Sequence, residues 1–319
     1  MVAGDEDGDE DGGETMVTLG AMYRRHRPPE ELAGFAAFAE REGFDELWVV
    51  EDCFWAGGMS AAAVALARTE RITVGFGIAP AVARNVAIAA MELAGVARMF
   101  PGRFVAGFGH GVTDWMRQIG ALPTSQLAAL EETIAVVRRL LAGERVSFDG
   151  RHVHVRDVEL VFPPSPVPPV LLGATGPKSL DVAARVADGL MLPEASSPAF
   201  IEAAMARAGH PPHCAVYALY AIDDDGDRAR AAVAGGLDGF APGTGDQRLA
   251  LLTGDGGVEV TGAAERAHRY AVAGTPAECA AAIAQLRDAG ATSVILVPQH
   301  DDDEQLARAA REVVPLLRP

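Results

Sequence analysis

His110 is the side chain in this sequence best suited to exchange a proton near neutral pH. It stands between Gly109 and Gly111 at the end of RFVAGFGHG, which reads as a buried strand followed by a turn. Imidazole titrates near neutrality and can donate a proton or polarise a carbonyl group. We interpret His110 as a catalytic residue. The alternative is a histidine that only hydrogen-bonds a neighbouring loop and sets its shape.

Two consecutive carboxylates, Glu51 and Asp52, end another apolar run and form a second candidate for acid–base chemistry. Consecutive residues of a strand point to opposite sides, so only one of the two is expected to face a pocket. We take Glu51 as the second possible proton donor.

The stretch ITVGFGIAPAVARN places Gly75 and Gly77 inside a run that otherwise reads as a buried strand. Glycine packs no side chain in a strand and weakens it. One interpretation is a bulge or a tight exit from the strand. The other is that a flat group lies against the bare backbone at that point.

The stretch LGATGPKS has the pattern of a phosphate site. A glycine-rich turn that opens a helix at Lys178 presents free backbone N–H groups and the positive end of the helix dipole. Lys178 is also the only lysine in the chain. The alternative is an ordinary glycine turn with a surface lysine, because a lone glycine-rich turn is a weak signal.

Hydrolytic and metal motifs are missing from the sequence. It contains no GxSxG, HExxH or CxxC, and Cys53, Cys214 and Cys279 are far apart without metal-ligand spacing. We therefore expect no metal, and cysteines that fit a reducing cytoplasm. A glycine-lined site without hydrolytic side chains favours a bound cofactor that carries the difficult chemistry.

Apolar, β-rich runs alternate with alanine-rich helical runs along most of the chain, which predicts parallel strands with helical crossovers. The predicted strands are Met16–Met22, Glu46–Glu51, Ile72–Ile78, Arg103–Gly109, Val170–Gly173, Gly189–Leu192, Ala215–Ile222 and Ser293–Val297. The predicted helices include Pro29–Glu42, Val86–Met99, Gln126–Leu141, Lys178–Ala187, Pro198–Ala208, Pro276–Ala289 and Glu304–Leu316. Eight strands favour an α/β fold of the (β/α)8 barrel type, with the site at the carboxyl ends of the strands. An open doubly wound sheet is the alternative, although no GxGxxG follows the first strand.

Three segments depart from this alternation. Residues 146–155 read as a hairpin that turns at Asp149-Gly150. Residues 225–270 are glycine-rich and irregular, which suggests an insertion that acts as a lid or an interface. Residues 1–14 are predicted to be a disordered acidic tail, with residues 15–319 as one domain.

The charge of the chain argues against polyanionic partners. The net charge is −17, and it is still −10 without the seven acidic residues of the tail. An acidic body is unsuited to nucleic acid or an anionic membrane. No apolar run approaches the ~18 residues of a membrane span. The expected partner is a small-molecule substrate.

Five stretches in this order resemble the luciferase-like family of flavin- and deazaflavin-dependent oxidoreductases. They are GFDELWVVED, ITVGFGIAPAVARN, RFVAGFGHG, GATGPKSLDVAARVADG and AGTPAECAAAIAQLRDAGATSVILV. The resemblance covers nearly all of residues 16–317. It implies a (β/α)8 barrel with an insertion, usually as a homodimer, and a non-prolyl cis peptide at the end of the third strand that supports the cofactor ring. The matching bond here is Gly77–Ile78.

The resemblance also implies which residues form the site. GATGPKS matches the family segment that holds the cofactor phosphate. The cofactor-binding residues expected from these motifs are Asp52, Gly77, Ile78, Asn85, Gly109, Gly173, Ala174, Thr175, Gly176 and Lys178. The aromatic residues expected to shape the substrate pocket are Tyr23, Trp55 and Trp115.

The resemblance favours the deazaflavin F420 over FMN, because the compact length and GFGHG are similar to the deazaflavin-using branch. The expected reaction is hydride transfer between reduced deazaflavin and a small organic substrate. The alternatives are an FMN-dependent monooxygenase and a cofactor-binding homologue without turnover. Members that oxidise sugar phosphates or alcohols often have Asp-His where this chain has Glu51-Asp52. Alcohol oxidation by that histidine is therefore doubtful here.

Overall fold

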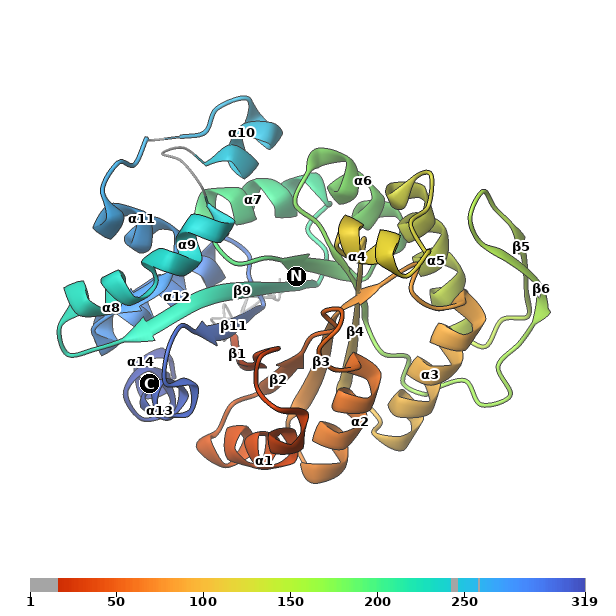
Figure 1. Ribbon diagram of the computed structural model, residues 1–319, viewed down its shortest axis with the longest axis horizontal. Coiled ribbons are helices and arrows are strands. Elements are labelled where there is room, and N and C mark those ends of the chain that lie inside the picture. The colour runs from red at the N-terminus through yellow and green to blue at the C-terminus, as the bar shows by residue number, and fades with distance from the viewer. Residues whose placement is uncertain (1–16, 242–245, 258, 319) are drawn as a thin grey trace, which may run out of the picture.

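The computed structural model describes residues 17–241, 246–257 and 259–318, which form a closed barrel of eight parallel strands (Figure 1). Around the ring the order is β1, β2, β3, β4, β7, β8, β9 and β11, and β11 pairs with β1 to close it. The predicted (β/α)8 barrel is confirmed, and the open sheet is excluded. The predicted tail, residues 1–14, lies outside the described residues.

The eight predicted strands all form, with ends shifted by at most a few residues. The ring strands are β1 (Thr18–Tyr23), β2 (Glu46–Val49), β3 (Thr73–Pro80), β4 (Phe104–Gly109), β7 (Val170–Gly173), β8 (Gly189–Leu192), β9 (His213–Ile222) and β11 (Ser293–Pro298). A short strand, β10 (Val272–Gly274), pairs with the carboxyl end of β9. The predicted hairpin is also present, as β5 (Val146–Asp149) and β6 (His154–Val158).

Helices surround the barrel. They are α1 (Leu32–Glu42), α2 (Gly58–Arg68), α3 (Val86–Met99), α4 (Thr113–Gln118), α5 (Gln126–Leu141), α6 (Pro177–Val186), α7 (Pro198–Arg207), α8 (Gly226–Ala232), α9 (Ala234–Phe240), α10 (Gln247–Thr253), α11 (Ala263–Tyr270), α12 (Pro276–Asp288), α13 (Asp302–Arg308) and α14 (Val314–Leu317). A 3-10 turn, Pro29–Glu31, precedes α1. None of the described helices is long and apolar enough to cross a membrane.

The last predicted helix, Glu304–Leu316, is not one regular helix. It begins at Asp302 and passes through a π-helical turn at Ala309–Val313 before α14. Pro315 has no N–H group, so it cannot donate the regular α-helical bond to the residue four positions earlier. A local π-turn at this point accommodates the missing donor.

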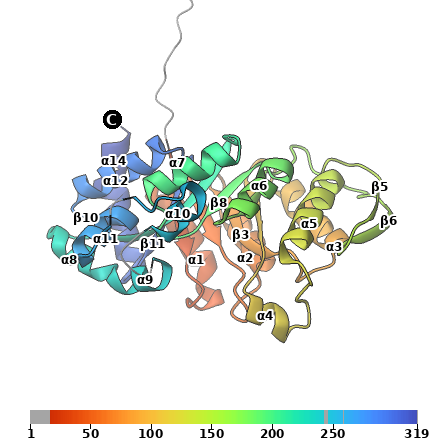
Figure 2. The ribbon, with the colours of Figure 1, turned by 90° about the horizontal axis from the view of Figure 1, so that it is seen from above.

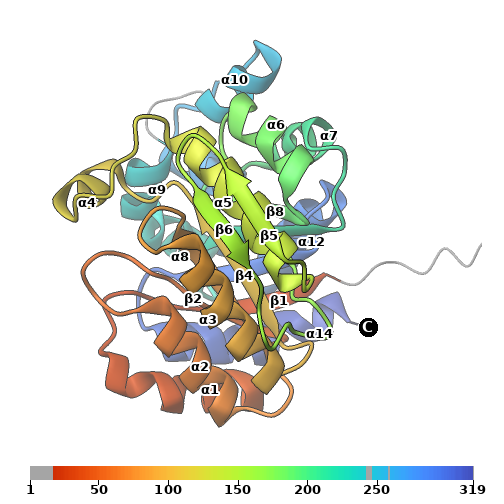
Figure 3. The ribbon, with the colours of Figure 1, turned by 90° about the vertical axis from the view of Figure 1, so that its right-hand side faces the viewer.

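The hairpin and the insertion lie at opposite ends of the molecule (Figures 1 and 2). The hairpin packs beside α5 (Figure 3). The insertion forms α8 to α11 in its described part, so it is more helical than its glycine content predicts. Its α10 is fastened to the loop after β8, because Ser197 Oγ donates to Asp246 and Arg248 donates to the Glu194 carbonyl oxygen at 2.7 Å.

Large side chains fill the barrel interior, as expected for eight strands. The apolar members of this layer are Trp48, Leu171, Met191, Ala215, Tyr217, Ile295 and Val297. Glu46 also faces inward and accepts hydrogen bonds from Trp48 Nε1 at 2.6 Å, Ser293 Oγ at 2.5 Å and Thr18 Oγ1 at 3.2 Å. Burial raises the pKa of this carboxyl in spite of the three donors.

Candidate functional site

Three neighbouring strand ends bring the predicted glycines together around Ile78. Glycine spares this side chain two clashes, because a Cβ at Gly109 would lie 2.1 Å from Ile78 Cδ1 and one at Gly173 would lie 3.2 Å from Ile78 Cγ2. The Gly77–Ile78 peptide is cis, as the resemblance implied. The carboxyl ends of β3, β4 and β7 therefore form one continuous patch of backbone at the barrel mouth.

The bulge considered for this stretch is present, because the pairing of β3 with β4 shifts register between Phe76 and Ala79. The two glycines also make room for interior side chains. A Cβ at Gly75 would lie 2.3 Å from Trp48 Cδ2, and one at Gly77 would lie 2.0 Å from Met191 Cε and 2.7 Å from Tyr217 Oη. The flat group that lies against Gly75 is therefore the indole of the chain itself. At both positions, glycine makes room for side chains that cross the barrel interior.

His110 lies at this mouth, directly after β4. The pairing of Pro80 with Gly109 and the hydrogen bond from Ala81 N–H to the Gly109 oxygen, at 3.0 Å, bring the ends of β3 and β4 together beside it. The ring is half-buried, and Nδ1 is buried with no hydrogen-bond partner among the described residues. Burial lowers the pKa of His110, partly offset by a hydrogen bond with the Gln126 backbone. The neutral imidazole is therefore favoured, with one nitrogen left for another group.

Glu51 is held by three donors. Arg84 donates to both of its carboxylate oxygens, at 2.7 Å for Nη2 to Oε2, and the Gly58 N–H donates to Oε2 at 2.9 Å. Arg84 also contacts Glu92 at 3.1 Å, and its hydrogen bonds with Glu51 raise the pKa of its guanidinium. Both oxygens of Glu51 are thus engaged within the chain, and its part in proton transfer stays a prediction.

Asn85, predicted to bind cofactor, is the N-cap residue of α3. Its Oδ1 accepts a hydrogen bond from the Ala87 N–H at 2.9 Å, as expected of asparagine before a helix. The residue is exposed. The side-chain oxygen of Asn85 is thus bonded within the chain, and its side-chain NH2 group remains the part that could reach a ligand.

A second cluster joins the loops after β1, β2 and β4. Arg25 Nη1 donates to Asp52 Oδ2 at 2.8 Å, and the Arg25 guanidinium lies 4.7 Å from the Trp55 ring centroid. The rings of Trp55 and Trp115 meet edge to face, with centroids 6.1 Å apart. Short α4, which carries Trp115, projects from the barrel in Figures 2 and 3. The two tryptophans predicted for the substrate pocket do come together.

Tyr23 does not belong with them, contrary to our prediction. Its ring packs edge to face on Phe35 of α1 at 5.2 Å, and its hydroxyl donates to the Pro28 carbonyl oxygen. Side chains alternate across a strand, and in β1 it is Met22 that packs with the inner layer. Tyr23 therefore faces the helical layer and is removed from the substrate pocket.

The GATGPKS turn offers fewer free donors than its sequence indicates. Ala174 N–H donates to the Met191 carbonyl oxygen at 3.2 Å, Gly176 N–H donates to Ser179 Oγ at 3.2 Å, and proline at 177 has none. Within residues 174–178, this leaves the N–H groups of Thr175 and Lys178. A Cβ at Gly176 would meet no atom within 4 Å, so the space in front of this turn is open.

Glu194 is a candidate site residue that the sequence analysis missed. It lies two residues beyond the end of β8, after Pro193, and its charged neighbours are Arg248, Asp52 and Arg25. Since β2 and β8 are four strands apart around the ring, Glu194 and Asp52 approach the mouth from opposite sides. Burial raises the pKa of Glu194. The signal was present in GLMLPE, where a carboxylate comes two residues after the end of a predicted strand.

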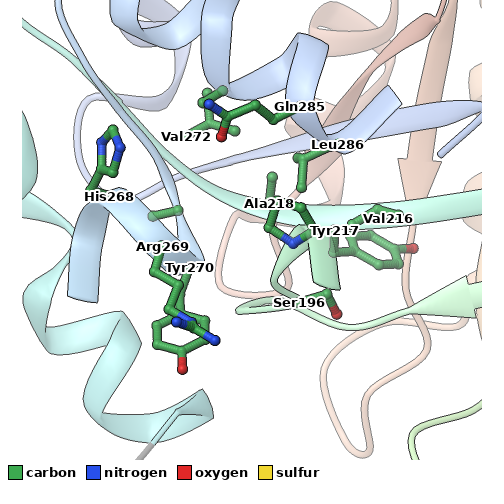
Figure 4. Close-up of a pocket in the computed structure, with 13 residues that line it drawn as sticks. Ser196, Val216, Tyr217, Ala218, His268, Arg269, Tyr270, Val272, Gln285 and Leu286 are labelled. Carbon is green, nitrogen blue, oxygen red and sulfur yellow. The ribbon is translucent and has the colours of Figure 1, made fainter. Parts of the chain in front are cut away.

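Two cavities of the described structure lie outside the barrel wall. One of about 340 Å³ lies between α7, α11, α12 and β9, and Figure 4 shows Arg269, Tyr270 and Gln285 around it while the Tyr217 ring points away. The other, of about 270 Å³, lies between β3, α2 and α3. Neither is lined by His110 or by the GATGPKS turn. The predicted site residues therefore lie apart from these two cavities.

The fold is that of the (β/α)8 barrel enzymes, whose sites lie at the carboxyl ends of the strands. The family model described as luciferase-like monooxygenase matches residues 12–293, and the chain belongs to this family of oxidoreductases. A 5,10-methylenetetrahydromethanopterin reductase of Methanolobus tindarius is 30% identical over 306 residues, which cover 88% of this chain and 93% of the relative.

Two solved structures share the barrel. An F420-dependent secondary alcohol dehydrogenase in complex with an F420–acetone adduct has a TM-score of 0.78 at 22% identity, covering 95% of this chain and 100% of its own. The coenzyme F420-dependent tetrahydromethanopterin reductase of Methanopyrus kandleri has a TM-score of 0.76 at 21% identity, with the same coverage. At these identities, the two likenesses show a common fold.

Proposed function

We propose that this chain is an F420-dependent oxidoreductase that transfers a hydride between the reduced deazaflavin and a small organic substrate. The observation that carries the proposal is the 30% identity to a methylenetetrahydromethanopterin reductase over nearly the whole of both chains. The barrel mouth supports it, because His110, the backbone around Ile78 and the GATGPKS turn occur at neighbouring strand ends.

Two observations fit a bound cofactor at this mouth. His110 Nδ1 is a buried polar atom with no partner among the described residues. The space around Gly176 is open, and the N–H groups of Thr175 and Lys178 at the start of α6 suit an anion.

The backbone of Gly77, Ile78, Gly109 and Gly173 would support the ring. Ala174 and Gly176 would shape the phosphate turn. Asp52 and Asn85 would lie at the margin of the barrel mouth. When bound, the deazaflavin would supply or accept the hydride.

Two side chains of the mouth are suited to handle the accompanying proton. The buried Nδ1 of His110 has no partner among the described residues, so the imidazole can take up a proton there and deliver it to the acceptor of the hydride. Glu194 has a raised pKa because it is buried, so its carboxyl group holds its proton to a higher pH than an exposed one. Of the two, His110 is our proposed catalytic residue. Trp55 and Trp115 would bound the organic substrate.

Titration of the purified chain with F420 and with FMN tests the proposal. We expect F420 to bind, with a change in its absorption spectrum, and FMN to bind at least about tenfold more weakly. Reduced F420 should then be consumed with an unsaturated substrate. FMN binding with oxygen consumption would favour the monooxygenase, and F420 binding without turnover on any substrate would favour the non-catalytic homologue.

We also propose that the chain forms a homodimer through α2 and α3. Ile88, Met91 and Met99 of α3 are exposed, and so is Val64 of α2. Helices α2 and α3 lie side by side (Figure 1). Contiguous exposed apolar side chains mark an interaction surface. Met91→Glu should therefore halve the mass measured by light scattering. Leu251→Glu, an equally exposed change on α10, should leave it unchanged, and equal masses for both variants would refute this interface.

The remaining expectation concerns the cellular location of the enzyme. We propose a cytoplasmic enzyme that acts on a small molecule. The three cysteines are free in the structure, and burial raises the pKa of both Cys214 and Cys279 to about 12. Thiols that are buried and far from the thiolate form are unreactive and suit a reducing compartment.

A further inference from the structure

We propose that Tyr217 is a positioning residue that holds the Gly77 peptide group in place at the cofactor face of the barrel. This inference rests on the proposed function. Tyr217 Oη donates a hydrogen bond to the Gly77 carbonyl oxygen at 3.0 Å, and both groups are buried. It is a direct link from the barrel interior to the backbone that is proposed to support the cofactor ring.

The bond crosses the whole barrel. Tyr217 lies on β9 and Gly77 on β3, and in the ring of eight strands these two are four strands apart in either direction. Strands this far apart share no ladder hydrogen bonds. The phenol of Tyr217 therefore links β9 to β3 across the barrel interior, just below the mouth.

The phenol is held in one orientation by its surroundings. Its ring meets the Trp48 ring edge to face at 5.8 Å, and Met191 lies beside Gly77 on the same side as the Tyr217 hydroxyl. Burial raises the pKa of Tyr217 well above that of an exposed tyrosine, with smaller contributions from Glu194, Glu46 and Asp52. The hydroxyl therefore keeps its proton and stays a donor at neutral pH.

Holding this carbonyl also determines where the next residue points. The Gly77 carbonyl and the Ile78 N–H belong to one planar peptide group, so fixing the oxygen fixes the plane. Ile78 is the residue that packs between the ends of β4 and β7 at the mouth. Without the Tyr217 hydroxyl, the Gly77–Ile78 peptide plane could rotate, and the backbone surface that supports the ring would no longer have one fixed orientation.

The same strand provides a matched control. Tyr220 is also fully buried, but its hydroxyl has no hydrogen-bond partner among the described residues. Tyr217→Phe removes a hydroxyl that is bonded to the Gly77 backbone, and Tyr220→Phe removes one that is not. Both substitutions remove one hydroxyl from a buried tyrosine of β9, Tyr217 in the interior layer and Tyr220 in the outer core.

Two measurements test the proposal. Hydrogen–deuterium exchange of the protein without cofactor should show faster exchange in the segment around Ile78 for Tyr217→Phe and parental exchange there for Tyr220→Phe. F420 titration should show roughly three- to tenfold weaker binding for Tyr217→Phe, the range expected for one lost buried hydrogen bond. Tyr220→Phe should bind F420 as the parent does.

The outcomes separate this inference from the function on which it rests. A parent chain that does not bind F420 refutes the proposed function. A parent that binds F420, with Tyr217→Phe equal to it in both affinity and exchange, refutes the role of Tyr217 alone. A Tyr217→Phe chain that unfolds far below the melting temperature of Tyr220→Phe would show that the link is structural, and would overturn the positioning role.

Discussion

Replacing His110 with alanine is expected to lower turnover by roughly 10²–10⁴-fold, the usual range for general acid–base catalysis. Affinity for F420 should change little, because the proposed support for the ring is backbone and the proposed phosphate site is the GATGPKS turn. His110→Gln should lose a similar factor, since an amide can donate a hydrogen bond but cannot exchange a proton at neutral pH. Single-turnover kinetics with reduced F420 would measure the loss separately from binding.

The pH dependence of the same variants gives an independent check. Burial lowers the pKa of His110, so the imidazole is neutral through the neutral range and becomes protonated only in acid. In the direction that consumes reduced F420, His110 must carry the proton that it donates, so turnover of the parent should rise as the pH falls toward this lowered pKa. The unfolded chain binds the proton at a higher pH than the folded chain, so the contribution of His110 to folding stability falls below about pH 6.5. Both effects should disappear in His110→Gln.

Full activity in His110→Gln would exclude His110 as the proton-exchanging group. Its part would then be the loop-shaping hydrogen bond considered from the sequence. Glu194 would become the residue to test, by Glu194→Gln. Glu51 would be tested next, although Arg84 and the Gly58 N–H already occupy its carboxylate.

Replacing Gly176 with valine is expected to weaken F420 binding by about 10–100-fold, the loss expected for one or two hydrogen bonds to a charged group. The backbone at Gly176 has φ −118°, which valine adopts freely, and a Cβ there would meet no protein atom. The fold should therefore be unaffected, while the branched side chain would occupy the open space at the turn that carries the Thr175 and Lys178 N–H groups. Titration with F420 and a thermal unfolding curve would measure the two properties.

Lys178→Ala is the comparison for this prediction. Lys178 is exposed, so its flexible ammonium group is screened by solvent and should contribute no more than a few-fold to affinity. Gly176→Ala should fall between the two. If Lys178→Ala weakened binding strongly and Gly176→Val did not, the turn would act through one charge and our account of the backbone site would be incorrect.

Sequence patterns were sufficient to predict the barrel architecture. All eight ring strands and the hairpin could be placed, because alternating β-rich and helical runs report local periodicity and each crossover must return to a parallel neighbour. The helices Val86–Met99 and Gln126–Leu141 have the predicted bounds, since Asn85 and Ser125 cap their first turns. Helix α2 was not predicted. It follows Gly57-Gly58, and helix-disfavouring glycines obscure its start.

The sequence by itself placed most of the candidate residues at the barrel mouth, because a residue that follows a strand must lie at its carboxyl end. It did not determine what those residues touch. Only the tertiary structure decided that Glu51 is bound by Arg84, that Tyr23 faces α1, that Trp48 occupies the space left by Gly75, and that Tyr217 reaches Gly77. The alternation of side chains along a strand separates its two faces, but it does not say which face points into the barrel. Contacts across a barrel join residues far apart in the chain, and these depend on side-chain packing that no local pattern records.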